Sequence, residues 1–195
     1  FLEEWLKLRP NCESIAIEPN HKMADECRKR GLKVIQDLAE NINNLDNFAD
    51  LIVSFEVLEH IDEPLKFIKN LKKMLRPGGY IFVSTLSIDG FDLKTLWDRS
   101  EQISPPHHIN FLSISGFKAL FERVGMSDIS ISTPGKLDTD IVRNALENDS
   151  SLLKNQQFLR HILNDDKIAK EFQIFLSNNC LSSHAWVVAK KKLET

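Results

Sequence analysis

Short apolar runs alternate with longer amphipathic segments along this chain. The runs are mostly aliphatic, are bounded by polar residues, and lie at residues 14–18, 32–35, 51–53 and 80–83. Runs of this length are typical of strands rather than helices. Residues 51–53 read Leu-Ile-Val without a polar side chain, which predicts a strand buried on both faces of a sheet.

The segments around these runs have helical periodicity. They predict helices over residues 1–8, 20–29, 62–76 and 113–124. Asn20 and Ser113 stand where a helix cap is expected, and Pro64 falls in the first turn of its helix. Gly31 and Gly125 follow the ends of two helices, where a left-handed residue closes the last turn.

Residues 50–85 form the centre of this pattern, because they read as one strand, one helix and a second strand. Two strands joined in this way lie parallel, with a right-handed crossover. The alternation predicts an α/β three-layer sandwich. Two further strands are expected at 128–133 and 184–190, paired antiparallel at one edge. The segment 136–181 between them has few strand formers and is a predicted helical insert.

Composition narrows the function classes only slightly. The 195 residues carry a net charge of −3, with 42% hydrophobic and 27% charged residues, so neither a nucleic-acid nor a membrane partner is expected. No apolar run approaches the roughly 20 residues that span a bilayer. The three cysteines form no close pair, which indicates reduced thiols in the cytoplasm. We expect a monomer or a homodimer.

Ligands of open parallel sheets bind beyond the carboxyl ends of the strands, so site residues are expected there. Glu18 ends the strand at 14–18, and its two carboxylate oxygens could accept both hydroxyls of a ribose. Asp37 follows the strand at 32–35 and could accept from an adenine amino group. Each also has a purely structural interpretation, Glu18 as a surface acid at a helix cap and Asp37 as a turn residue.

The loop 54–60 is the first candidate for a site. Phe55 and Glu56 follow the strand at 51–53 and would line a pocket floor. His60 has an unperturbed pKa near 6.5 and could act as a base, although a packing role is favoured. In the segment 105–111, His107 and His108 could orient a substrate or accept its proton, or they could be structural. No partner lies at zinc-ligand spacing, so no metal site is predicted.

Taken together, three motifs resemble one family. EVLEHI at 56–61, LRPGGYIFVST at 75–85 and PPHHINFLS at 105–113, followed by a helix that ends in Gly-Met, look like class I S-adenosylmethionine-dependent methyltransferases. The resemblance is closest to the small-molecule group called types 11 and 23. It covers residues 1–133 and the last strand.

The resemblance implies a Rossmann-like, mostly parallel sheet with an antiparallel last strand, in a single methyltransferase domain over residues 1–195. It implies S-adenosyl-L-methionine as cofactor and direct displacement of its methyl group by a small-molecule acceptor. His108 or His107 would serve as the general base. The predicted cofactor-binding residues are Glu18, Pro19, Asp37, Leu38, Phe55, Glu56 and His60.

One departure from the family leaves two alternatives open. The glycine-rich first motif does not occur in these residues. We expect that motif and the first strand to precede Phe1. The alternatives are an NAD-dependent oxidoreductase on a similar fold and a non-catalytic adapter that retains only the fold. The acceptor is not identified by any residue of the sequence.

Overall fold

A computed structural model describes residues 1–193 of the chain. It divides the chain into two compact units, Phe1–Asp46 and Asn47–Thr195, each with a sheet of its own. Residues 194 and 195 of the predicted domain lie outside the described residues. That residues 1–195 form a single domain stays a prediction. No helix within residues 1–193 is both long and apolar enough to cross a membrane.

The first unit contains two short parallel strands with a helix between them. Its elements are α1 (Leu2–Leu8), β1 (Ala16–Ile17), α2 (His21–Lys29), β2 (Val34–Ile35) and the 3-10 turn η1 (Ala39–Asn41). The Asn20 side chain caps α2 by accepting a hydrogen bond from the Met23 amide at 3.2 Å. Gly31 follows with a φ of +80°. Local sequence thus determines both ends of α2, as predicted.

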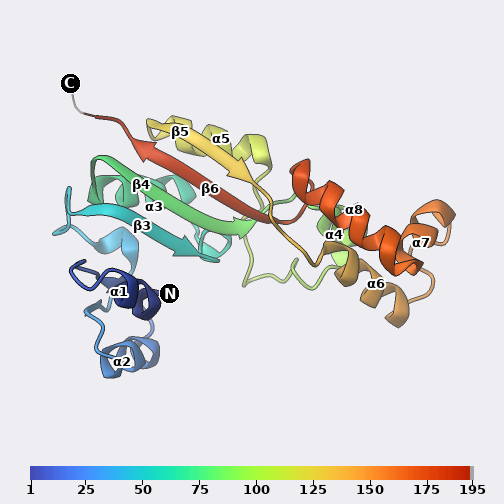
Figure 1. Ribbon diagram of the computed structural model, residues 1–195, viewed down its shortest axis with the longest axis horizontal. Coiled ribbons are helices and arrows are strands. Elements are labelled where there is room, and N and C mark those ends of the chain that lie inside the picture. The colour runs from blue at the N-terminus through green and yellow to red at the C-terminus, as the bar shows by residue number, and fades with distance from the viewer. Residues whose placement is uncertain (194–195) are drawn as a thin grey trace. The chain divides into compact units, whose positions relative to one another are not determined.

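The second unit is built on a four-stranded sheet (Figure 1). Its strand order is β3 (Ala49–Phe55), β4 (Leu75–Leu86), β6 (His184–Lys191) and β5 (Met126–Ser132). β3 pairs with β4 in parallel, and β6 runs antiparallel to both β4 and β5. The α/β class, the parallel crossover and the antiparallel last strand are therefore confirmed.

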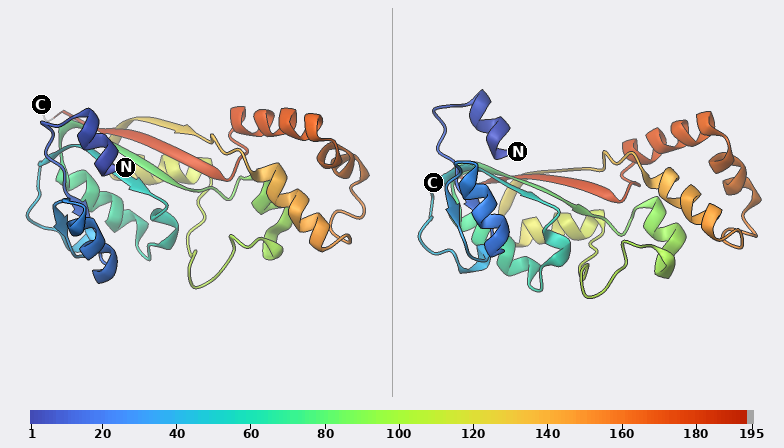
Figure 2. Two further views of the ribbon diagram at one scale, coloured as in Figure 1. Left: turned by 60° about the horizontal axis from the view of Figure 1, so that its bottom comes forward. Right: turned by 90° about the horizontal axis from the view of Figure 1, so that it is seen from below.

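Helices α3 (Pro64–Met74) and α5 (Ile114–Arg123) pack on one face of this sheet (Figure 2). Phe67, Ile68 and Phe117 of these helices are buried, as are Ile81 of β4 and Val187 of β6. The other face carries exposed apolar side chains, including Leu51 at 42% and Phe55 at 43% exposure. The prediction that β3 is buried on both faces is wrong, because β3 is an edge strand and the helices of its unit cover one face.

The segment between β5 and β6 folds as three helices, α6 (Asp138–Asn148), α7 (Gln157–Asn164) and α8 (Asp166–Asn178). They lie beyond the carboxyl ends of β4 and β5 with α4 (Phe91–Leu96), which is followed by η3 (Trp97–Arg99) (Figure 1). Leu96, Val142 and Leu163 form the buried centre of this group. The insert therefore has a small core of its own, to which α4 contributes.

Gly90 lies where no side chain fits, at the start of α4. A Cβ atom there would lie 2.3 Å from the Cα of Ser183, a backbone atom that cannot rotate away. We expect Gly90→Ala to lower the free energy of unfolding by at least about 1 kcal/mol, the cost of overpacking. Urea denaturation would measure it. Gly116→Ala is the matched control, because its closest neighbour is the Ser113 side chain at 3.2 Å. Equal stability of the two variants would contradict the close packing at Gly90.

Candidate functional site

Glu56 follows β3 directly and has an unusual backbone conformation. Its φ is +51°, in the left-handed region that residues other than glycine rarely adopt. The Glu56 amide donates to the Ser84 carbonyl at 2.9 Å, and Glu56 Oε1 accepts from Ser84 Oγ at 2.5 Å. The end of β4 therefore holds Glu56 by backbone and side chain. Residues kept in such conformations concentrate at functional sites.

Glu56 also faces a histidine that the sequence analysis missed. His184 Nδ1 lies 3.5 Å from Glu56 Oε1, while His184 Nε2 accepts from the indole N–H of Trp186 at 2.9 Å. Because Nε2 accepts, the proton of the neutral ring is on Nδ1 and faces Glu56. The strand itself was predicted. The alternation of side chains along that strand places His184 and Trp186 on one face, and this spacing could have indicated that the two residues interact.

Glu59 is the second acid of this loop and lies in η2 (Leu58–His60). It is 1% exposed, and its Oε2 accepts from Thr85 Oγ1 at 2.8 Å. Burial raises the pKa of the Glu59 carboxyl, and the nearby charge of Glu56 raises it further. Ser84 and Thr85, adjacent in β4, thus hold one acid each. Glu59 is not among the residues predicted from the sequence, although it stands three positions after Glu56.

His60 and His108 come together at this loop, with ring centroids 4.8 Å apart. His60 Nδ1 lies 2.7 Å from the His107 carbonyl oxygen, and His108 Nδ1 lies 2.7 Å from the Gln102 carbonyl oxygen. A carbonyl only accepts, so both Nδ1 atoms carry the proton. Both Nε2 atoms are therefore lone-pair nitrogens in the neutral rings.

Main-chain hydrogen bonds fix this arrangement. The amides of Ile109 and Asn110 both donate to the Glu59 carbonyl oxygen, at 2.9 and 3.0 Å. The Asn110 side-chain amide also donates to the Ile61 carbonyl. The loop that carries His108 is thus attached directly to the turn that carries Glu59 and His60.

His107 and Phe55, the other predicted site residues of the second unit, are both exposed. The ring of His107 is exposed, and its contribution to the cluster is the backbone carbonyl that accepts from His60. Phe55 lies on the exposed sheet face, with its ring centroid 5.7 Å from that of Phe82. The structure therefore gathers Glu56, His60 and His108 at strand ends, while their roles stay predictions.

In the first unit, the two predicted acids follow neighbouring parallel strands. Glu18 Oε1 accepts from the Asn20 amide at 2.8 Å. Asp37 Oδ1 accepts from the Leu38 amide at 2.7 Å and from Asn41 Nδ2 at 2.8 Å. Within residues 1–193, no hydrogen bond occupies the second oxygen of either carboxylate. Pro19 and Leu38 are exposed beside them. These acids therefore fit hydroxyl and amino donors of a nucleoside.

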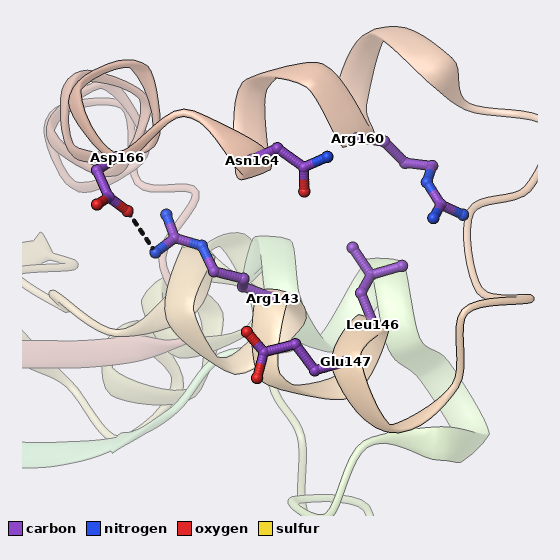
Figure 3. A pocket seen from close by; sticks show the side chains of 6 residues that line it. All are labelled: Arg143, Leu146, Glu147, Arg160, Asn164 and Asp166. Atoms are coloured by element: carbon purple, nitrogen blue, oxygen red, sulfur yellow. Dashed lines mark hydrogen bonds and ion pairs between the residues drawn. The ribbon is translucent and has the colours of Figure 1, made fainter.

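A hollow of about 370 Å³ lies within the helical insert, and no predicted site residue lines it. Figure 3 shows its arginines, Arg143 and Arg160, on opposite sides. Arg143 is already paired with Asp166 at 2.9 Å, and Arg160 donates to backbone carbonyls of residues 150 and 152. Since internal partners engage both guanidinium groups, we assign no substrate to this hollow.

Comparisons with known proteins agree on one family. A family model described as a methyltransferase domain matches residues 2–131. The mitochondrial ubiquinone biosynthesis O-methyltransferase of Dictyostelium discoideum is 36% identical over 70 residues, which are 35% of this chain and 22% of that protein. The tRNA U34 carboxymethyltransferase of Idiomarina loihiensis is 33% identical over 93 residues, 47% of this chain and 28% of that protein. The chain therefore matches less than a third of either relative's length.

Solved structures resemble the fold over nearly the whole chain. A SAM-dependent methyltransferase from Archaeoglobus fulgidus has a TM-score of 0.65 and 18% identity, covering 97% of this chain and 80% of that one. A SAM-dependent methyltransferase from Thermotoga maritima, described as a possible histamine N-methyltransferase, has a TM-score of 0.61 and 17% identity, covering 92% and 73%. At these identities the likeness establishes the fold.

Proposed function

We propose that this chain, which belongs to the methyltransferase-domain family, transfers a methyl group from S-adenosyl-L-methionine to a small-molecule acceptor. The observation that carries the proposal is the family match over residues 2–131. The matched region includes the acids after β1 and β2 and the loop 54–60. The cofactor supplies an electrophilic methyl group on sulfur, and the protein supplies binding, orientation and proton acceptance.

The proposed cofactor-binding residues of each unit suit a different part of the cofactor. In the first unit, Glu18 with Pro19 accepts hydrogen bonds from the ribose hydroxyls, and Asp37 with Leu38 receives the adenine. In the second unit, Phe55, Glu56 and His60 bind the methionine part. Glu56 suits an ammonium group, because its carboxylate is negatively charged and is held in place by Ser84.

The role of general base is assigned to His108, with His107 as the second candidate. His108 donates through Nδ1 to the Gln102 carbonyl, which leaves the Nε2 lone pair free to take a proton. A base within reach of a hydroxyl acceptor assists its attack in line with the departing sulfur. The exposed ring of His107 is less constrained, because only its backbone carbonyl is held.

A small molecule is favoured over a nucleic acid by charge. The chain carries a net charge of −3, which disfavours a phosphate backbone. The relatives include both an enzyme named for ubiquinone biosynthesis and one named for a tRNA nucleoside, so the comparison does not decide between a small-molecule and a tRNA acceptor. The cytoplasmic location and the monomeric or homodimeric state stay predictions from the sequence.

The test is ligand-dependent stabilisation followed by methyl transfer. S-adenosylhomocysteine at 100 times its dissociation constant should stabilise the folded chain by about 2.7 kcal/mol, and NAD should not. Stabilisation by NAD alone would favour the oxidoreductase, and stabilisation by neither would favour the adapter. Transfer of a radiolabelled methyl group should then occur to small-molecule extract rather than to tRNA. Labelling of tRNA alone would contradict the acceptor class.

A further inference from the structure

Three potential metal-ligand side chains converge at the end of β3. Glu59, His60 and His108 each offer one ligand atom, and these atoms all lie within 4.8 Å of one another. Within residues 1–193, no hydrogen bond or ion pair joins the three side chains to each other. Two donors bound tetrahedrally to one Zn²⁺ lie about 3.4 Å apart, given bond lengths near 2.1 Å. Side-chain rotations that bring the three ligand atoms closer together would therefore close the cluster around a cation.

The two histidines are oriented as metal ligands usually are. Metal-binding imidazoles donate the other ring N–H to a carbonyl or carboxylate, which fixes the tautomer and the ring plane. His60 does so to the His107 carbonyl and His108 to the Gln102 carbonyl, both at 2.7 Å. Each ring is thus held by its Nδ1, and the Nε2 lone pair is available to a cation.

The third ligand is a buried carboxylate without a cationic partner. Glu59 is 1% exposed, and within residues 1–193 no lysine or arginine forms an ion pair with it. The neutral Thr85 hydroxyl donates to Oε2 and orients it. Buried charges in proteins are normally paired or bound to metal. The backbone bonds from Ile109 and Asn110 to the Glu59 carbonyl hold the loop of His108 in place without any ion.

We propose that Glu59, His60 and His108 bind a divalent transition-metal cation, with Zn²⁺ as the best match to two imidazoles and one carboxylate. Three protein ligands leave at least one coordination position open. An oxygen ligand there, water or an acceptor hydroxyl, would lose its proton more readily. With the cation bound, His108 Nε2 would be a ligand, and the metal-bound oxygen would replace it as the proton acceptor. This role in catalysis rests on the proposed function, whereas cation binding does not.

The proposal differs from the sequence prediction for a physical reason. Spacing along the chain gave His107 and His108 no partner for a metal. The other two ligands, Glu59 and His60, come from η2, and only the folded backbone brings η2 next to the loop of His108. His107, although adjacent to His108, contributes a carbonyl and no ring nitrogen.

Isothermal titration of the chelator-treated full chain tests the site directly. Zn²⁺ should bind with a stoichiometry of one, and more tightly than Mg²⁺, which prefers oxygen ligands. His60→Ala and His108→Ala should each weaken Zn²⁺ binding by at least about tenfold, the lower limit seen for outer-shell partners. Both rings are partly or fully exposed, so both variants should fold. His107→Ala is the matched control in the same loop and should bind Zn²⁺ as the unmodified chain does.

Three results would overturn the metal site. These are no stoichiometric Zn²⁺ binding by the unmodified chain, tighter binding of Mg²⁺ than of Zn²⁺, and an equal loss in the His107→Ala control. S-adenosylhomocysteine binding should be measured in the same samples. Absence of stoichiometric Zn²⁺ binding by the unmodified chain, with its S-adenosylhomocysteine binding retained, refutes the metal site alone. Absence of S-adenosylhomocysteine binding in a chain that binds Zn²⁺ refutes the proposed function alone.

Discussion

Replacing Asp92 by asparagine is expected to stabilise the protein by about 2 kcal/mol more at pH 8 than at pH 4. Asp92 is 0% exposed, and no hydrogen-bond partner for either carboxyl oxygen is found within residues 1–193. Burial raises its pKa to about 6, with a further contribution from the charge of Asp138. Urea denaturation of both proteins across this pH range measures the difference.

The sign follows from proton binding. The folded chain holds the Asp92 proton up to a pKa of about 6, whereas the unfolded chain releases it near the ordinary value of 3.8. The stability that the protonated form contributes is therefore fully present below pH 3.8 and is lost as the pH rises through 6. Asparagine does not ionise, so the variant should not lose this stability.

Asp138→Asn is the matched control, because it makes the same change at a neighbouring buried acid with full partners. Asp138 accepts from Gln173 Nε2 at 2.7 Å, from Ser182 Oγ at 2.5 Å and from the Ser183 amide at 2.7 Å. An amide group cannot accept all three, so this variant should be destabilised by about 1–3 kcal/mol at pH 8. A pH-independent effect of Asp92→Asn would contradict the assignment of the raised pKa to that residue.

Local signals predicted the elements well because capping and periodicity act over a few residues. Asn20 and Ser113 accept the hydrogen bonds expected of helix caps, from Met23 and Gly116. The burial of Leu51 was mispredicted because an apolar run does not reveal which sheet face the helices cover. The effect of the Asp138 charge on buried Asp92 could not be predicted from the sequence for a related reason, since packing of α4 on α6 brings the two acids together.

In the candidate site, too, local sequence predicted some residues, whereas others come together only in the folded chain. Glu18, Asp37 and Glu56 were predicted as site residues because Glu18 ends a predicted strand and the other two closely follow one. The meeting of His108 with His60 depends on backbone bonds to the Glu59 carbonyl, and every residue has a carbonyl. Such bonds do not depend on residue type, so the spacing of residues along the chain could not predict the cluster of Glu59, His60 and His108.

Replacing Glu18 by alanine is expected to weaken S-adenosylhomocysteine binding by about 10- to 100-fold. A hydrogen bond to a charged group contributes about 1.5–3 kcal/mol, so the expected range corresponds to the loss of one such bond to a ribose hydroxyl. Glu18 Oε1 already accepts from the Asn20 amide, which orients the carboxylate before the ligand arrives. Titration calorimetry measures the affinity. Glu18→Gln should lose less, because it keeps one acceptor oxygen.

Asp25→Ala provides the control within the same unit, since it removes an acid of α2 whose partners are the exposed His21 and Arg28. Its affinity for S-adenosylhomocysteine should equal that of the unmodified chain. The melting temperature of Glu18→Ala without ligand should change little, because the Asn20 side chain still caps α2 through Met23. Unchanged affinity in Glu18→Ala would show that the acid after β1 is a helix-end residue and not the ribose ligand. Equal losses in Glu18→Ala and Asp25→Ala would instead assign the effect to the net charge of the unit.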